Sequence, residues 1–123
     1  MAPVVAQTNF SDFFGGKAPP RFIFEDEQCV VFDEELSPQA PVHFVIVPRK
    51  IIPRLCHVTD DEEQLLGHML LVARTIALQR GLDRSGYHVI VDEDHRAVRL
   101  RGIHVFGRAL HHMLWPVGPG AKL

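Results

Sequence analysis

The sequence predicts an α+β domain in which one long helix packs against an antiparallel sheet. Apolar residues recur at helical spacing over residues 65–77, directly after a run of acidic residues. Short apolar runs bounded by turn residues lie on both sides of that segment. These runs cover residues 22–24, 29–32, 42–47, 87–91 and 98–106. The predicted element order is therefore β-β-β-α-β-β, in a chain of 123 residues that suits one domain.

The predicted helix has a clear start and a clear end. Thr59 is followed three residues later by Glu62, which is the spacing of a capping box. Acidic side chains at residues 60–63 interact favourably with the positive end of the helix dipole. Gly81 suits the position just after the last turn. The pattern predicts a helix of about 20 residues, or about 30 Å.

The predicted strands differ in the regularity of their patterns. The first two apolar runs are separated by the polar residues 25–27, which predicts a β-hairpin. Residues 42–47 are apolar on both faces except at His43, which predicts a central, buried strand. Residues 98–106 form the least regular run, because two arginines and a glycine interrupt it.

Composition and charge argue against several classes of function. The net charge of −2 gives no general attraction to nucleic acid or to a membrane surface. No run approaches the ~20 apolar residues that span a bilayer. Cys29 and Cys56 lack the spacing of a CxxC zinc motif and are expected to be reduced thiols, so no metal or other cofactor is predicted. No targeting signal is recognised, and a cytoplasmic or nuclear location is expected.

Several motifs in order resemble one known family. They are SPQAPVHF at residues 37–44, VPRK at 47–50, LLGH at 65–68, YHVIVDE at 87–93 and HVFG at 104–107. Together they resemble the Hint branch of the histidine-triad (HIT) proteins, and the similarity covers residues 13–107. The chain is accordingly divided into a flexible N-terminus at 1–12, a HIT-like domain at 13–107 and an irregular C-terminal tail at 108–123.

The resemblance implies a fold, an assembly and a chemistry. It implies a five-stranded antiparallel sheet, a homodimer that joins two sheets edge to edge, and a site for a purine nucleoside monophosphate. Active members hydrolyse phosphoramidates or aminoacyl-adenylates. In them the middle histidine of an H-x-H-x-H motif attacks the α-phosphorus, and water releases the covalent nucleotidyl-histidine.

Aligned on the HVFG motif, the three histidine positions fall at Leu100, Gly102 and His104. Alternate residues of a strand share one face, so these three positions are expected to converge on one phosphate. Only His104 keeps an imidazole, and the nucleophile position is a glycine. Loss of a covalent nucleophile typically lowers the rate by about 10⁴–10⁶-fold. The prediction is a catalytically impaired protein in which His43 and His104 are relics of the active site.

Other positions also depart from the family pattern. Asp92 stands where an asparagine contacts phosphate, so an anion is expected to repel the ligand there. A shortened loop at residues 95–97 replaces the glycine-rich phosphate loop, and Ala97 matches its leaving-group serine. By alternation Arg101 should face the core, where an unpaired guanidinium costs several kcal/mol. The last strand is therefore expected to fray or reroute, or Arg101 to find an acidic partner near residues 25–35.

The resemblance also assigns a nucleotide site, with Glu35 as the best equivalent of the acidic residue that binds the ribose hydroxyls. The expected nucleotide-binding residues are Phe14, Phe32, Glu35, Leu36, His43, Asp92 and His104. His68 on the predicted helix is expected at the dimer interface. The adjacent pair His111-His112 is expected on the surface rather than as a metal ligand.

Three functions are compatible with these features. A Hint body with a lost triad resembles the avian W-chromosome-linked variant of this branch, which implies a dimerising protein that pairs with itself or with an active Hint. The alternative is a weak purine-nucleotide binder or nucleoside phosphoramidate hydrolase that uses the remaining histidines. RNA binding through the arginines at residues 96–108 is less favoured, because no aromatic residues alternate with them.

Overall fold

The computed structural model describes residues 20–35 and 38–107. The predicted N-terminus at 1–12 and the predicted tail at 108–123 lie outside this part of the chain, as do the expected site residues Phe14 and Leu36. Among the residues that are described, no helix combines the length and the apolar character needed to cross a membrane.

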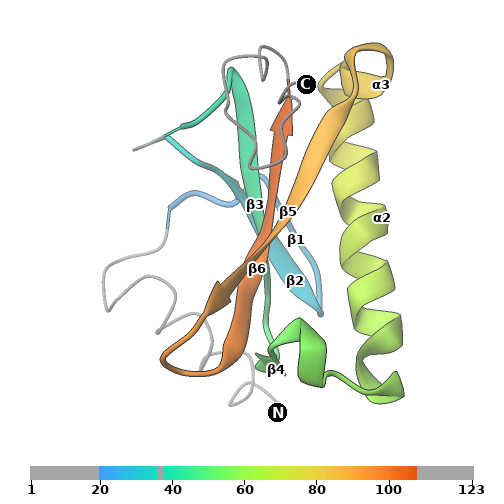
Figure 1. The fold of residues 1–123 in the computed structure, drawn as a ribbon. Coiled ribbons are helices and arrows are strands. Elements are labelled where there is room, and N and C mark those ends of the chain that lie inside the picture. The colour runs from blue at the N-terminus through green and yellow to red at the C-terminus, as the bar shows by residue number, and fades with distance from the viewer. Residues whose placement is uncertain (1–19, 36–37, 108–123) are drawn as a thin grey trace, which may run out of the picture.

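The elements follow the predicted order, with short additions between them (Figure 1). They are β1 (Phe24–Glu25), β2 (Cys29–Asp33), β3 (Val42–Pro48), β4 (Ile52–Pro53), the 3₁₀ turns η1 (Leu55–His57) and η2 (Asp60–Glu62), α2 (Glu63–Gln79), α3 (Leu82–Ser85), β5 (Tyr87–Asp94) and β6 (Arg99–Gly107). The α+β class, the long helix and the antiparallel sheet are confirmed. The two-residue strand β4 makes this a six-stranded sheet rather than the expected five-stranded one.

The sheet is antiparallel throughout, and β3 lies at its centre, as predicted. In β3, Val45 lies opposite Phe32 of β2 on one side and opposite His104 of β6 on the other. The predicted hairpin is also present, with Phe24 of β1 opposite Val31 of β2. The strand β5 pairs with the far side of β6.

The helix α2 covers one face of the sheet (Figure 1), and the main core lies between them. Phe44, Ile46 and Val105 from the sheet pack there with Met69 and Ile76 from α2, and all are buried. The opposite face carries a smaller apolar cluster formed by Val30, Phe32, Val45 and Val47. His43 and His104 belong to this second face, because residues of a strand alternate between faces.

The predicted capping box is confirmed. The Thr59 side chain accepts a hydrogen bond from the Asp61 backbone N–H at 3.3 Å, and the Glu62 carboxylate accepts one from the Thr59 backbone N–H at 3.0 Å. Gly81 follows the helix with a φ of 75°, a left-handed conformation that glycine adopts without strain. The two signals therefore fix the ends of the helical segment as predicted.

The strand β6 forms along its whole length, but with a bulge that changes which residues share a face. Asp92 lies opposite Gly102, while its neighbour Glu93 lies opposite Leu100, so Arg101 is an extra residue in β6. Leu100 is consequently fully buried in the core beneath α2. The prediction that positions 100, 102 and 104 share one face is therefore wrong.

The bulge also corrects the prediction for Arg101. Its guanidinium does not enter the core but lies 4.0 Å from the Asp92 carboxylate, with 38% of the side chain exposed. The acidic partner thus comes from β5 and not from residues 25–35. The physical reason is that regular alternation would bury a charge and expose a leucine, whereas the extra residue reverses both. The strand neither frays nor reroutes.

Candidate functional site

Two histidines and one carboxylate form a continuous row across three strands. His43 of β3 and His104 of β6 lie with Nε2 and Nδ1 2.8 Å apart. On the other side of the same ring, His104 Nε2 lies 3.2 Å from the Asp92 Oδ2 of β5. These are three of the expected nucleotide-binding residues, and the pairing of β3, β5 and β6 brings them together.

The backbone fixes the direction of the hydrogen bonds in this row. The Gln39 N–H, which can only donate, points at His43 Nδ1 at 3.2 Å. His43 therefore carries its proton on Nε2 and donates it to His104 Nδ1. His104 in turn carries its proton on Nε2 and donates it to the Asp92 carboxylate. Both rings are neutral in this arrangement, and both of their lone pairs already accept a hydrogen bond.

Burial and charge support this arrangement of protons. Burial lowers the pKa of His43, and the neighbouring His104 lowers it further, because two imidazolium ions cannot lie side by side. The hydrogen bond from His104 lowers the pKa of Asp92, with a smaller contribution from the charge of Arg101. The Phe106 ring packs 4.3 Å from the His43 ring, centroid to centroid, and restricts its motion. The row thus ends in an ionised carboxylate at neutral pH.

Gly102, the expected nucleophile position, is closed by the backbone of β3. A Cβ atom at this residue would lie 2.8 Å from the carbonyl oxygen of Ile46, closer than side chains normally approach backbone oxygen. A side chain at residue 102 therefore requires the two strands to move apart. The glycine at residue 102 is therefore a requirement of the local packing.

In the shortened loop between β5 and β6, two backbone amide groups are already hydrogen-bonded within the chain. The Asp94 side chain accepts hydrogen bonds from the backbone N–H groups of Arg96, at 3.0 Å, and Ala97, at 3.2 Å. A glycine-rich phosphate loop uses such N–H groups to hold the anion. Here the Asp94 carboxylate accepts these hydrogen bonds in place of a bound phosphate.

The other expected site residues lie at or near a pocket beside the row. Glu35 is exposed and lines a pocket of about 490 Å³ together with His43. Phe32 is buried on the same face of the sheet. Arg80 also lines the pocket and forms a bidentate ion pair with Asp33, in which its two terminal nitrogens donate to the two carboxylate oxygens at 2.8 and 3.1 Å. Sequence reasoning missed this pair, because only folding brings the end of α2 to the end of β2.

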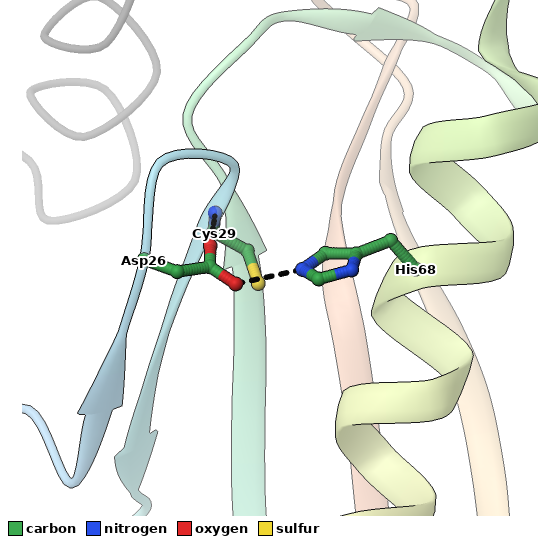
Figure 2. A group of neighbouring side chains, drawn as sticks. All are labelled: Asp26, Cys29 and His68. Atoms are coloured by element: carbon green, nitrogen blue, oxygen red, sulfur yellow. Dashed lines mark hydrogen bonds and ion pairs between the residues drawn. The ribbon is translucent and has the colours of Figure 1, made fainter.

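His68 makes a contact within its own chain, and its expected place at a dimer interface stays a prediction. Its Nε2 forms a hydrogen bond with Asp26 Oδ2 at 2.7 Å within the same chain, next to Cys29 (Figure 2). The side chain thus links α2 to the turn before β2. A polar side chain on the helix stripe suggested an interface, but the sequence carried no signal that Asp26 would lie opposite it.

Comparisons with known proteins identify a family and similar sequences. Residues 7–112 match the family described as scavenger mRNA decapping enzyme C-term binding. The purine nucleoside phosphoramidase of Escherichia coli (strain K12) is 35% identical over 112 residues, covering 88% of this chain and 93% of that protein. An uncharacterized HIT-like protein of Synechococcus elongatus is 32% identical over 114 residues, covering 90% and 96%.

Solved structures give the same result. A HIT family hydrolase from Legionella pneumophila Philadelphia 1 superposes with a TM-score of 0.70 at 30% identity, covering 89% of this chain and 97% of that one. A histidine triad protein from Clostridium difficile gives 0.63 at 27% identity, covering 80% and 86%. Fold and site thus define a nucleotide-binding, hydrolase-like class of protein. Within that class, the chain belongs to the histidine-triad (HIT) superfamily.

Proposed function

We propose that this HIT protein is a Hint-type purine-nucleotide binder with strongly impaired hydrolysis, which acts by dimerising with itself or with an active Hint. The observation that carries the proposal is Gly102 beneath the Ile46 carbonyl. The position that should bear the attacking imidazole holds no side chain, and the backbone leaves no room for one. The same departures are the basis for likening the chain to the avian W-linked variant.

The remaining histidines are poorly suited to take over the attack. A histidine nucleophile needs a free lone pair, and His43 and His104 each use theirs to accept a hydrogen bond. Freeing the His104 lone pair, which lies on Nδ1, means breaking the hydrogen bond from His43 Nε2. The Asp92 and Asp94 carboxylates also place negative charge where an active site would stabilise phosphate.

Turnover of adenosine 5′-phosphoramidate tests the impaired chemistry, with the E. coli phosphoramidase as the positive control. We expect kcat/KM to be lower than that of the control by at least about 10⁴-fold. His104→Ala should leave any residual rate unchanged. A rate within tenfold of the control that disappears in His104→Ala would overturn the proposal and favour the second candidate, a weak phosphoramidate hydrolase.

Calorimetry with AMP and with adenosine tests nucleotide binding separately from chemistry. The acidic Glu35 and the pocket beside His43 suit the ribose hydroxyls, whereas the carboxylates near the loop disfavour the phosphate. We expect AMP to bind no more than a few-fold more tightly than adenosine. Absence of heat with both ligands would remove nucleotide binding from the proposal and leave dimerisation alone.

The dimerisation part of the proposal is supported by the exposed edge of the sheet. Among the described residues, β5 pairs only with β6, so its outer edge is available for another strand. Val89 and Val91 on that strand are 39% and 37% exposed, and α2 exposes Leu70 and Leu71 by about half of their surface. An apolar edge of this kind is typical of strand-to-strand association between subunits.

A further inference from the structure

A second group of reactive side chains lies on the face of the sheet away from the histidine row. Asp26 of the β1–β2 turn, Cys29 at the start of β2 and His68 in the middle of α2 meet there (Figure 2). One possible ligand atom from each, a carboxylate oxygen, a sulfur and a ring nitrogen, lies within 4.8 Å of the other two. Oxygen, sulfur and nitrogen donors of these types are the ligands that zinc takes in proteins.

The turn holds the carboxylate in place for such a role. Asp26 Oδ1 accepts hydrogen bonds from the backbone N–H groups of Gln28, at 2.8 Å, and Cys29, at 2.9 Å. The second oxygen, Oδ2, is thereby directed at His68 Nε2, 2.7 Å away. The nearby Arg49 Nε donates to the Asp26 backbone carbonyl at 2.7 Å.

We propose that Asp26, Cys29 and His68 bind one zinc ion, with a water molecule as the fourth ligand. A tetrahedral site with zinc–ligand bonds of about 2.0–2.3 Å separates its ligand atoms by roughly 3.3–3.6 Å. The three donor atoms lie within 4.8 Å of one another, so shifts of about an ångström or less bring them to these separations. The contact between Asp26 and His68 lengthens slightly to admit the ion.

The three side chains of the cluster differ in burial. Cys29 is fully buried, while the side chains of Asp26 and His68 are 28% and 33% exposed. His68 also lines a cavity of about 580 Å³ between β1 and α2, together with Phe24 and Leu71. The ion and its water would reach the cluster beside His68, on the side of this cavity.

Protons and charges balance when zinc binds. Burial and the Asp26 carboxylate raise the pKa of the Cys29 thiol to about 12, so the metal-free thiol keeps its proton. Zinc displaces that proton to solvent and forms the Zn–S bond. The His68 proton moves to Nδ1, which leaves the Nε2 lone pair for the metal. One thiolate and one carboxylate then neutralise the dication, and the ion ties the β1–β2 turn to α2.

Metal titration of the full chain tests the site without reference to nucleotide chemistry. Protein freed of metal with a chelator should bind one zinc per chain by calorimetry. Its cobalt complex should show thiolate-to-cobalt charge transfer, which reports a Co–S bond directly. Zinc at a hundredfold excess over its Kd should raise Tm by roughly 10 °C.

Matched variants distinguish this site from the other thiol and imidazole groups. Cys29→Ser and His68→Gln should each weaken zinc binding by at least about 100-fold. Cys56→Ser is the control, because Cys56 is exposed and lies 3.8 Å from His57, which makes it the other Cys–His pair of the described chain. A background with His111→Ala and His112→Ala removes the adjacent histidines of the sequence.

Each possible result of these titrations either supports or overturns the zinc site. Zinc binding that survives Cys29→Ser, or that disappears with Cys56→Ser, would overturn the proposal, as would a cobalt complex without charge transfer. If Cys29→Ser does not fold because its hydroxyl is buried, His68→Gln at a partly exposed position decides the question. Failure of the zinc site would leave the proposed nucleotide function untouched, since neither measurement involves the histidine row.

Discussion

Two glycines with opposite surroundings give the sharpest test at the scale of single residues. Gly102→Ala places a methyl group against the Ile46 carbonyl at 2.8 Å, so it should lower the free energy of unfolding by about 1–3 kcal/mol. Gly67→Ala, in α2 with nothing within 4 Å of its added Cβ, should raise it by about 0.5–1 kcal/mol. Urea unfolding measures both variants. Changes of the same sign would contradict the close approach of β3 and β6.

His43 provides a second residue-scale prediction, on pH. Because its pKa is lowered below the ordinary 6.5, the unfolded chain takes up the proton first as the pH falls. The stability contributed by neutral His43 is complete above about pH 6.5 and is lost as the pH falls through the folded-state pKa. NMR titration should place the midpoint of His43 below 6.5, with the proton of the neutral ring on Nε2.

A matched pair of variants connects that titration to stability. His43→Gln should reduce the loss of unfolding free energy between about pH 7.5 and pH 5, whereas His57→Gln, at an exposed position, should not. A folded-state midpoint above 6.5 for His43 would show that the hydrogen-bonded row is protonated differently from the order derived from Gln39.

At the scale of elements, the start of the helix is the most testable feature. Thr59→Ala removes the side chain that accepts the Asp61 N–H and should lower the free energy of unfolding by about 1 kcal/mol. Thr75→Ala is the control within α2, because the Thr75 hydroxyl only donates back to the Leu71 carbonyl at an exposed position. Chemical denaturation should show a loss for the first variant and little change or a gain for the second.

Those elements that depend on local pattern were predictable from the sequence. The capping box, the hairpin and the buried central strand each follow from the chemistry of a few neighbouring residues, and all three are present. The bulge at Arg101 was not predictable, because it depends on how β5 and β6 align and on the cost of burying one guanidinium. An alternating sequence pattern does not show whether a strand contains an inserted residue that forms a bulge.

The candidate site was likewise only partly predictable from the sequence. His43, Asp92 and His104 were identified from their motifs, but the sequence suggested that Asp92 would repel a ligand and not that it would hold His104. The contacts of Arg80 with Asp33 and of His68 with Asp26 span more than 40 positions. Such pairs arise only from the packing of α2 on the sheet, which no single segment specifies.

At the scale of the whole molecule, the prediction concerns the outer edge of β5. Val91→Lys places a charge on the exposed edge strand and should convert a dimer to a monomer in size-exclusion chromatography with light scattering. Val98→Lys is the matched control, since Val98 is 49% exposed but lies in the β5–β6 turn. A dimer that survives Val91→Lys would move the interface elsewhere, and a monomeric parent chain that also ignores an active Hint would end the dimer proposal.

The bulge in β6 also bears on whether a full histidine triad fits this chain. Leu100 lies opposite Ile52 among apolar side chains, so a histidine introduced there would enter the interior instead of facing a nucleotide. Turning residue 100 outward requires residues 99–101 to slide by one position along β5, which would direct Arg101 inward. The histidine at residue 100 is unfavourable without the shift in pairing, and the shift is unfavourable while residue 101 is an arginine. On the proposed function, single substitutions in β6 would therefore not restore phosphoramidate hydrolysis.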